Sequence, residues 1–310
     1  MAPEHGTGVA ILLRHADIAL YHAKGRREGS LQFFEPGMAT PSIVRHKAET
    51  DLRTAFHSGA LEVDFQPIIS LRSMRPVSCE ALVRWPTADD GMKSPAQFIP
   101  VAEEIGIIGE IGAWVLLRAC QECSKWPGYM RVAVNVSRLQ LREQNLHLLV
   151  ADALAAAALF PYRLEIEIPE RALLEDFSST RTAVDQLRAL GVGVCVDDFG
   201  AGCASLGWLR ALSIDKVKID RSFVRDLSDD SRPVKLLRGI ARLCSEIDIA
   251  VGVKGIETQS QADLIAAEVG IDEVQGFLFS SARSARRIEE LIERYSATSS
   301  ISSARNHLAN

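Results

Sequence analysis

The stretch that decides the fold is Gly191-Val192-Gly193-Val194-Cys195-Val196-Asp197-Asp198-Phe199-Gly200. Its valines alternate with other residues, which is typical of a strand with a buried face, and the strand ends in two carboxylates. Adjacent carboxylates repel each other and usually persist together only beside a cation or a functional partner. Asp197 and Asp198 therefore mark a candidate site. A solvated Asp-Asp turn is the alternative for this position taken alone.

Similar β-like runs alternate with amphipathic helical stretches along most of the chain. The β-like runs span 62–69, 76–85, 131–136, 163–168, 192–197, 215–219, 249–253 and 273–274. The helical stretches span 108–126, 145–158, 178–190, 232–247 and 258–269. This alternation predicts an α/β fold with a mainly parallel sheet, and so many units favour closure into a barrel.

The two ends of the chain have a different pattern. A short helix is expected from Ile11 to Lys24 and another from about Ser42 to His57. The tail from Ser296 is rich in Ser, Ala and Asn, and we expect it to be disordered.

The composition excludes several classes of function. The 310 residues carry a net charge of −5, which argues against general nucleic-acid binding because that requires a basic surface. There is no apolar run of about 18 residues and no secretory signal, so we expect no membrane segment and a cytoplasmic location. The six cysteines and seven histidines show no spacing typical of a zinc site or a catalytic triad.

Polar side chains follow most of the β-like runs. They are Glu80, Asn135, Glu167 with Glu170, Asp197 with Asp198, Lys218 with Asp220, Lys254 with Glu257, and Gln275. In a β/α barrel the carboxyl ends of the parallel strands meet on one face, where active sites lie. We therefore expect these side chains to converge from distant parts of the chain.

The acidic and amide members of this set offer only oxygen ligands, which suit Mg²⁺ or Mn²⁺. They are Glu80, Asn135, Glu167, Asp197 and Asp198. Such ions commonly act on phosphate substrates. Lys218 would offset phosphoryl charge or help to deprotonate water, and Arg84 would clamp a phosphate. Together these residues predict a metal–phosphate site.

Residues 48 to 294 resemble the EAL domain family, the cyclic-di-GMP phosphodiesterases. The matching motifs include Glu80-Ala81-Leu82-Val83-Arg84-Trp85, Val134-Asn135-Val136-Ser137, Glu167-Ile168-Pro169-Glu170, Asp197-Asp198-Phe199-Gly200, Lys218-Ile219-Asp220-Arg221 and Gln275-Gly276-Phe277. The resemblance implies a modified TIM (β/α)8 barrel with an antiparallel first strand. It also implies Mg²⁺- or Mn²⁺-dependent cleavage of cyclic-di-GMP to the linear dinucleotide.

The resemblance implies a role for each matching position. One metal would be held by Glu80, Asn135, Glu167 and Asp197, and Asp197 and Asp198 would contribute to a second. The catalytic group would comprise Lys218, Glu257 and Glu170, and the ligand site would be shaped by Gln66, Leu82, Arg84, Asp220, Glu257 and Gln275. A homodimer through the barrel is left open.

The N-terminal segment is similar to the end of a GGDEF domain. The likeness lies in residues 13–24 and 33–38, and the diguanylate cyclase motif itself is absent. The domains expected are therefore a GGDEF remnant and linker over 1–40, an EAL barrel over 41–295, and a disordered tail over 296–310.

The main departure from the family is Lys254. The family usually has Glu-Gly-Val-Glu where this chain has Lys254-Gly255-Ile256-Glu257. Opposite charges about 4 Å apart are worth roughly 4 kcal/mol near a surface, so a lysine here should weaken the second metal. It would not do so if its long stem carried the ammonium out to solvent.

Other departures lie in the loop after the aspartates and near Gln275. Ala201-Gly202-Cys203-Ala204-Ser205 lacks hydroxyls common in the family, Pro169 replaces a usual threonine, and Ser281-Ala282 replaces Arg-Pro. Each lost hydroxyl removes a hydrogen bond of about 1 kcal/mol. In the family this loop links dimer contacts to catalysis, so the changes put that link in doubt.

Three hypotheses remain open from the sequence. The first is a cyclic-di-GMP-binding protein with weak or absent hydrolysis, and the second is an active phosphodiesterase that accommodates Lys254. The third is an EAL scaffold that no longer binds nucleotide and acts through protein contacts.

Overall fold

The structure, a computed structural model, describes residues 8–9, 11–12, 15–16, 19, 33–34, 36–87, 91–202, 206–225, 227, 232–267 and 270–295. Most of the expected helix Ile11–Lys24, residues 203–205 and the tail from Ser296 lie outside the described residues. The chain divides into two compact units, one of residues 1–60 with 93–107, the other of 61–92 with 108–310.

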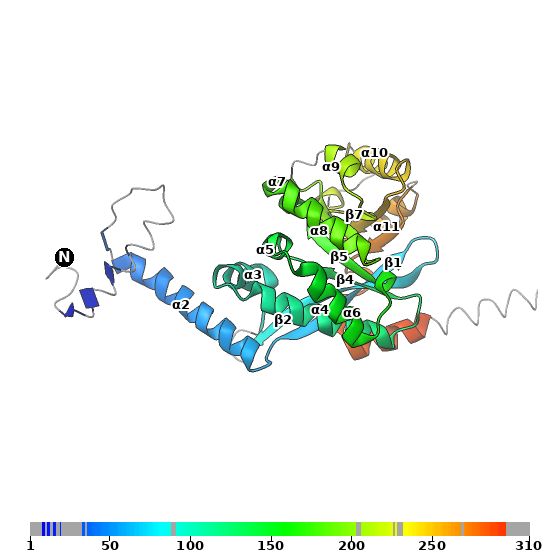
Figure 1. Ribbon diagram of the computed structural model, residues 1–310. Coiled ribbons are helices and arrows are strands. Elements are labelled where there is room, and N and C mark those ends of the chain that lie inside the picture. The colour runs from blue at the N-terminus through cyan, green and yellow to red at the C-terminus, as the bar shows by residue number, and fades with distance from the viewer. Residues whose placement is uncertain are drawn as a thin grey trace, which may run out of the picture. The chain divides into compact units, whose positions relative to one another are not determined.

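The larger unit is a closed barrel of eight strands (Figure 1). In sheet order they are β1 (Glu62–Ser70), β2 (Arg75–Thr87), β4 (Arg131–Asn135), β5 (Leu164–Pro169), β6 (Gly193–Phe199), β7 (Lys216–Ile219), β8 (Ala250–Lys254) and β9 (Glu273–Gln275). β1 pairs antiparallel with both β2 and β9, and this pairing closes the ring. The remaining neighbours are parallel. The predicted barrel with an antiparallel first strand is therefore confirmed.

Helices follow the strands, as the sequence pattern predicts. The longer ones are α4 (Ile108–Lys125), α6 (Leu146–Ala157), α8 (Phe177–Ala189), α10 (Arg232–Ser245) and α11 (Gln259–Ala266). The shorter ones are α5 (Arg138–Arg142), η1 (Pro161–Arg163), α7 (Glu170–Glu175), α9 (Leu206–Ala211) and η2 (Arg221–Phe223), and a last helix spans 285–295. β10 (Arg283–Ser284) pairs with β1, and β3 (Gly91–Lys93) lies beyond β2.

The smaller unit contains α2 (Pro36–His57) and α3 (Pro95–Glu104). α2 ends where predicted but begins at Pro36 rather than near Ser42. α3 begins with a capping box, in which the Ser94 side chain accepts a backbone N–H and Gln97 accepts the N–H of Ser94. In the described part of the chain, no helix is both long and apolar enough to span a bilayer.

The barrel interior is polar, and β5 shows why. Leu164, Ile166 and Ile168 are buried and alternate with the buried Glu165 and Glu167. Because successive side chains of a strand point to opposite faces, the glutamates share the face opposite the apolar residues. The same step of two residues separates Lys216 from Lys218 on β7 and Glu273 from Gln275 on β9.

The two members of each pair lie at different depths, so the inward polar side chains form two layers. The amino-end layer comprises Glu165, Lys216 and Glu273, with Arg131 of β4 beside them. Lys216 Nζ lies 2.6 Å from Glu165 Oε2 and 2.7 Å from Glu273 Oε2, and Arg131 also pairs with Glu273. The carboxyl-end layer comprises Asn135, Glu167, Lys218 and Gln275, and it forms the floor of the site described next.

Candidate active site

Asp197 and Asp198 lie on a bulge at the end of β6. The register between β6 and β7 shifts between Val196 and Phe199, and Asp198 has a φ of +54°. A regular strand would point neighbouring side chains to opposite faces, whereas a bulge re-aims one of them. Aspartate tolerates the left-handed conformation better than most residues. The bulge thus allows both carboxylates to reach one point.

That point is occupied by the ammonium of Lys254, at the end of β8. Lys254 Nζ lies 2.8 Å from both Oδ1 and Oδ2 of Asp197 and 2.8 Å from Asp198 Oδ1. The lysine side chain is 21% exposed, so its stem carries the charge into the barrel rather than out to solvent. Burial lowers the pKa of Lys254, but Asp197, Glu80 and Asp198 outweigh burial and raise that pKa above its ordinary value.

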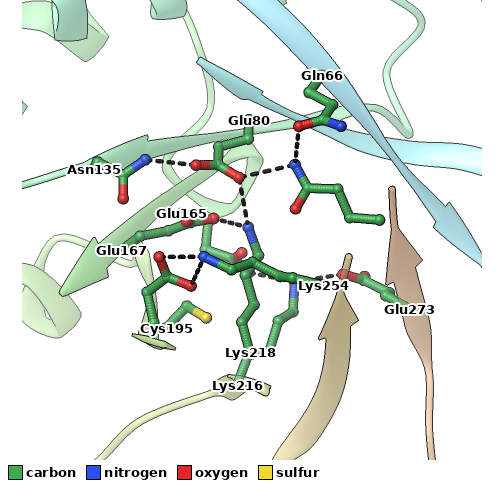
Figure 2. Close-up of polar contacts among 12 residues, drawn as sticks. Gln66, Glu80, Asn135, Glu165, Glu167, Cys195, Lys216, Lys218, Lys254 and Glu273 are labelled. Carbon is green, nitrogen blue, oxygen red and sulfur yellow. Dashed lines mark hydrogen bonds and ion pairs between the residues drawn. The ribbon is translucent and has the colours of Figure 1, made fainter. Parts of the chain in front are cut away.

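Lys218 provides a second ammonium deeper in the barrel. It pairs with Glu167 Oε1 and lies 3.5 Å from Glu80 Oε2 (Figure 2). Burial lowers the pKa of Lys218, but the neighbouring carboxylates raise it well above the ordinary value. Burial also raises the pKa of Glu80, but Lys218 and Lys254 outweigh this and bring it to about 2. The two lysines therefore hold a buried carboxylate in its charged form.

Amide side chains complete the network around Glu80. Asn135 Nδ2 donates to Glu80 Oε1 at 2.7 Å, and Gln275 Nε2 donates to Glu80 Oε2 at 2.9 Å. Gln275 Nε2 also donates to Gln66 Oε1 at 3.2 Å, and Gln66 Nε2 donates to the carbonyl oxygen of Ser280. Figure 2 shows Gln66, Glu80 and Asn135 approaching from different strands. The predicted convergence of these side chains is observed.

A cavity of about 420 Å³ opens above this network. Its lining includes eight side chains singled out from the sequence: Gln66, Glu80, Leu82, Asp198, Asp220, Lys254, Glu257 and Gln275. Arg221 and Phe277 also line it, and the sequence reasoning gave them no role. The sequence did carry a signal for both. Arg221 directly follows Asp220 at the end of β7, and Phe277 follows Gln275 by two positions at the end of β9.

Two of the predicted site residues, Arg84 and Glu170, have hydrogen-bond partners that the sequence did not indicate. Arg84 is on the same face of β2 as Glu80 and Leu82, and its Nε lies 3.3 Å from Asp64 Oδ2 on β1. Glu170 is buried, and its Oε2 accepts the backbone N–H groups of Gly200 at 3.0 Å and Gly202 at 3.2 Å. Glu170 therefore anchors the loop after the aspartates.

An EAL domain model matches residues 49–282 of this chain. The chain belongs to the EAL domain family. It is 42% identical over 288 residues to the uncharacterized protein y4lL of Sinorhizobium fredii, covering 93% of this chain and 35% of that protein. It is 34% identical over 298 residues to the cyclic di-GMP phosphodiesterase PdeR of Escherichia coli, covering 95% and 45%.

A solved structure resembles the EAL barrel of this chain. It is the PaMucR phosphodiesterase in complex with c-di-GMP, with a TM-score of 0.74, 32% identity, and coverage of 78% of this chain and 99% of that one. MucR of Pseudomonas aeruginosa is a bifunctional diguanylate cyclase and cyclic di-GMP phosphodiesterase. The chain spans between a third and a half of the length of the curated relatives it matches here. The GGDEF likeness before residue 40 stays a prediction.

EAL phosphodiesterases depend on divalent metal. The two metal positions that the family resemblance implies differ in how well their residues suit an ion. At the first position, the oxygen donors fit the chemistry of Mg²⁺ or Mn²⁺, and Glu167 Oε2 is buried without a hydrogen-bond partner. At the second position, between Asp197 and Asp198, the ammonium of Lys254 does not fit a metal. As arranged, no group of three or more His, Cys, Asp or Glu among the described residues is able to hold an ion.

Proposed function

We propose that this EAL domain binds cyclic-di-GMP in the cavity at the carboxyl end of the barrel and hydrolyses it weakly or not at all. The observation that carries the proposal is the contact of Lys254 with both Asp197 and Asp198. The likeness to a phosphodiesterase solved with c-di-GMP supports the choice of ligand.

The charges support a single metal. With every group ionised, Glu80, Glu167, Asp197 and Asp198 have a formal charge of −4, and Lys218 and Lys254 have a formal charge of +2. The remaining formal charge of −2 matches one divalent ion. With glutamate at position 254 the remaining charge would be −4, which matches two. We therefore expect one ion, held by Glu80, Asn135, Glu167 and Asp197.

The chain's own residues have distinct roles in this proposal. Arg84 binds a phosphate, and Gln66, Leu82, Asp220 and Gln275 shape the ligand cavity. Lys218 offsets the charge of the buried carboxylates and of the phosphate. Glu170 acts as a positioning residue through Gly200 and Gly202. A bound divalent ion would supply activated water at neutral pH.

A second candidate is an active phosphodiesterase that produces the linear dinucleotide pGpG. Retention of Glu80, Asn135, Glu167, Asp197 and Lys218 favours it. The third hypothesis, a scaffold that binds no nucleotide, has less support. Of the predicted ligand residues, Gln66, Leu82, Asp220, Glu257 and Gln275 line the cavity, and Arg84 does not.

Calorimetric titration with cyclic-di-GMP, run beside a hydrolysis assay with Mg²⁺ and with Mn²⁺, tests the proposal. We expect binding with little or no pGpG formed. Normal turnover would support the second candidate instead. Absence of binding with or without metal would leave the scaffold hypothesis. Equilibrium dialysis with Mn²⁺ should find one bound ion per chain, and two would contradict the role given to Lys254.

A further inference from the structure

The cavity at the carboxyl end of the barrel has a mainly acidic lining. Among the described residues that line it, four carry a carboxylate and two carry a basic group. The acidic residues are Glu80, Asp198, Asp220 and Glu257, and the basic residues are Arg221 and Lys254. A phosphodiester is an anion, so carboxylates repel it and it needs a cation at the point where it binds.

The two basic residues of the lining are neighbours, but they differ in depth. Lys254 directly precedes Gly255, and a Cβ atom added at Gly255 would lie 2.5 Å from Cβ of Arg221. The side chain of Lys254 is 21% exposed, whereas Arg221 is an exposed residue. Because water and salt screen a partly buried charge less than an exposed one, the ammonium of Lys254 is the stronger anchor for an anion.

The contacts of Lys254 leave room for such an exchange of partners. An ammonium group donates up to three hydrogen bonds, and here it contacts both oxygens of Asp197 and one oxygen of Asp198. The side chain of Asp197 is 9% exposed, whereas that of Asp198 is 52% exposed. An ion pair with so exposed a partner contributes little to stability. A phosphate oxygen is therefore able to replace Asp198 while Lys254 keeps its pair with Asp197.

We propose that Lys254 is a phosphate-binding residue, whose ammonium donates to a phosphate oxygen of the bound dinucleotide. The inference rests on the proposed binding of cyclic-di-GMP and specifies how one phosphate of that ligand is held. The donor is part of the chain, so this contact forms without a divalent ion between Asp197 and Asp198. Binding of the dinucleotide should therefore persist when metal is removed.

Calorimetric titration with cyclic-di-GMP in the presence of EDTA tests the contact. The wild type should bind. Lys254→Met should lower the affinity at least about tenfold, because a charge-assisted hydrogen bond to phosphate is lost. Lys125→Met is the matched control, since Lys125 is 56% exposed and does not line the cavity, and its affinity should equal that of the wild type. Lys254→Gln replaces Lys254→Met if thermal unfolding shows that the latter does not fold.

A double variant separates a direct contact from the general charge of the site. Lys254, Asp197 and Asp198 together have a formal charge of −1 in the wild type. Lys254→Met combined with Asp198→Asn leaves only Asp197 charged, so the sum is again −1. If the ammonium contacts the phosphate, this double variant should still bind at least about tenfold more weakly than the wild type. Recovery of wild-type affinity would overturn the contact.

Three further results have distinct meanings. Unchanged affinity in folded Lys254→Met would overturn the phosphate-binding role. A wild type that binds cyclic-di-GMP with Mn²⁺ but not with EDTA would also overturn it, and would leave the proposed function intact. A wild type that binds under neither condition would overturn the proposed function itself, and this inference with it.

Discussion

The ammonium of Lys254 lies 2.8 Å from a carboxylate oxygen of Asp198, although strand β7 separates their strands in the sheet. The bulge in β6 brings the two groups together, because it turns Asp198 toward the point that Asp197 also reaches. Lysine thus supplies a fixed positive charge between two aspartates. The site keeps its acidic residues, and an ammonium group contacts both aspartates.

Removing the guanidinium of Arg84 should weaken binding of cyclic-di-GMP. A charge-assisted bond to a phosphate contributes about 1.5–3 kcal/mol, so Arg84→Ala should lower the affinity at least tenfold in calorimetry. Asp64→Asn is the control, because it removes the charge that now pairs with Arg84 and leaves the arginine in place. Unchanged affinity in Arg84→Ala would rule out the phosphate-binding role.

Truncating Glu170 should destabilise the loop after the aspartates. Glu170→Ala leaves the N–H groups of Gly200 and Gly202 without their acceptor, at a cost of about 1–3 kcal/mol in the free energy of unfolding. Glu170→Gln keeps an acceptor oxygen and should recover most of the loss. Urea denaturation measures both variants, and equal stability of Glu170→Ala and wild type would contradict the anchoring role.

Removing the ammonium of Lys216 should cost far more than removing a similar one at the surface. Lys216→Met leaves Glu165 and Glu273 charged in the barrel interior, and breaking such a buried pair costs about 3–5 kcal/mol. Lys125→Met removes an ammonium that is 56% exposed and lies at the same 2.7 Å from Glu122. Because Glu122 keeps Arg118 at 3.8 Å, this change should cost less than about 1 kcal/mol. Similar losses in thermal or urea unfolding would show that the amino-end layer is not a tightly coupled network.

Stability should fall in alkaline solution because of buried thiols. Burial raises the pKa of Cys244 from an ordinary 9.0 to about 11. The unfolded thiol ionises first, so its contribution to stability is present below pH 9 and is lost as the pH rises through 11. Cys244→Ala should therefore show a shallower decline in unfolding free energy over this window. Identical slopes for variant and wild type would refute the contribution of this thiol.

The sequence predicted the strands closely because their apolar patterns are strong and their ends carry turn residues. It also predicted the convergence of Glu80, Asn135 and Glu167, since parallel strands bring their carboxyl ends together. The amino-end layer was missed, although the signal was present. Charged residues two positions apart, such as Glu165 with Glu167, indicate a strand with a polar inner face.

The particular contacts that side chains from different strands make with one another could not be predicted from the sequence. Asp64 as the partner of Arg84 depends on the register of β1 against β2, which motifs do not specify. The direction of Lys254 was left open, because a long flexible stem can place its ammonium inside or outside. Tertiary packing decides such choices.

The most direct test of the central claim compares cyclic-di-GMP hydrolysis in the wild type, Lys254→Glu and Lys254→Gln, at saturating Mg²⁺ and Mn²⁺. Glutamine removes the ammonium without adding a carboxylate, so it separates relief of the blocking charge from restoration of a metal ligand. We predict that Lys254→Glu hydrolyses the dinucleotide about 10²-fold faster than the wild type, with Lys254→Gln well below it. Normal turnover in the wild type, or no gain in a folded Lys254→Glu that binds the dinucleotide, would contradict the account.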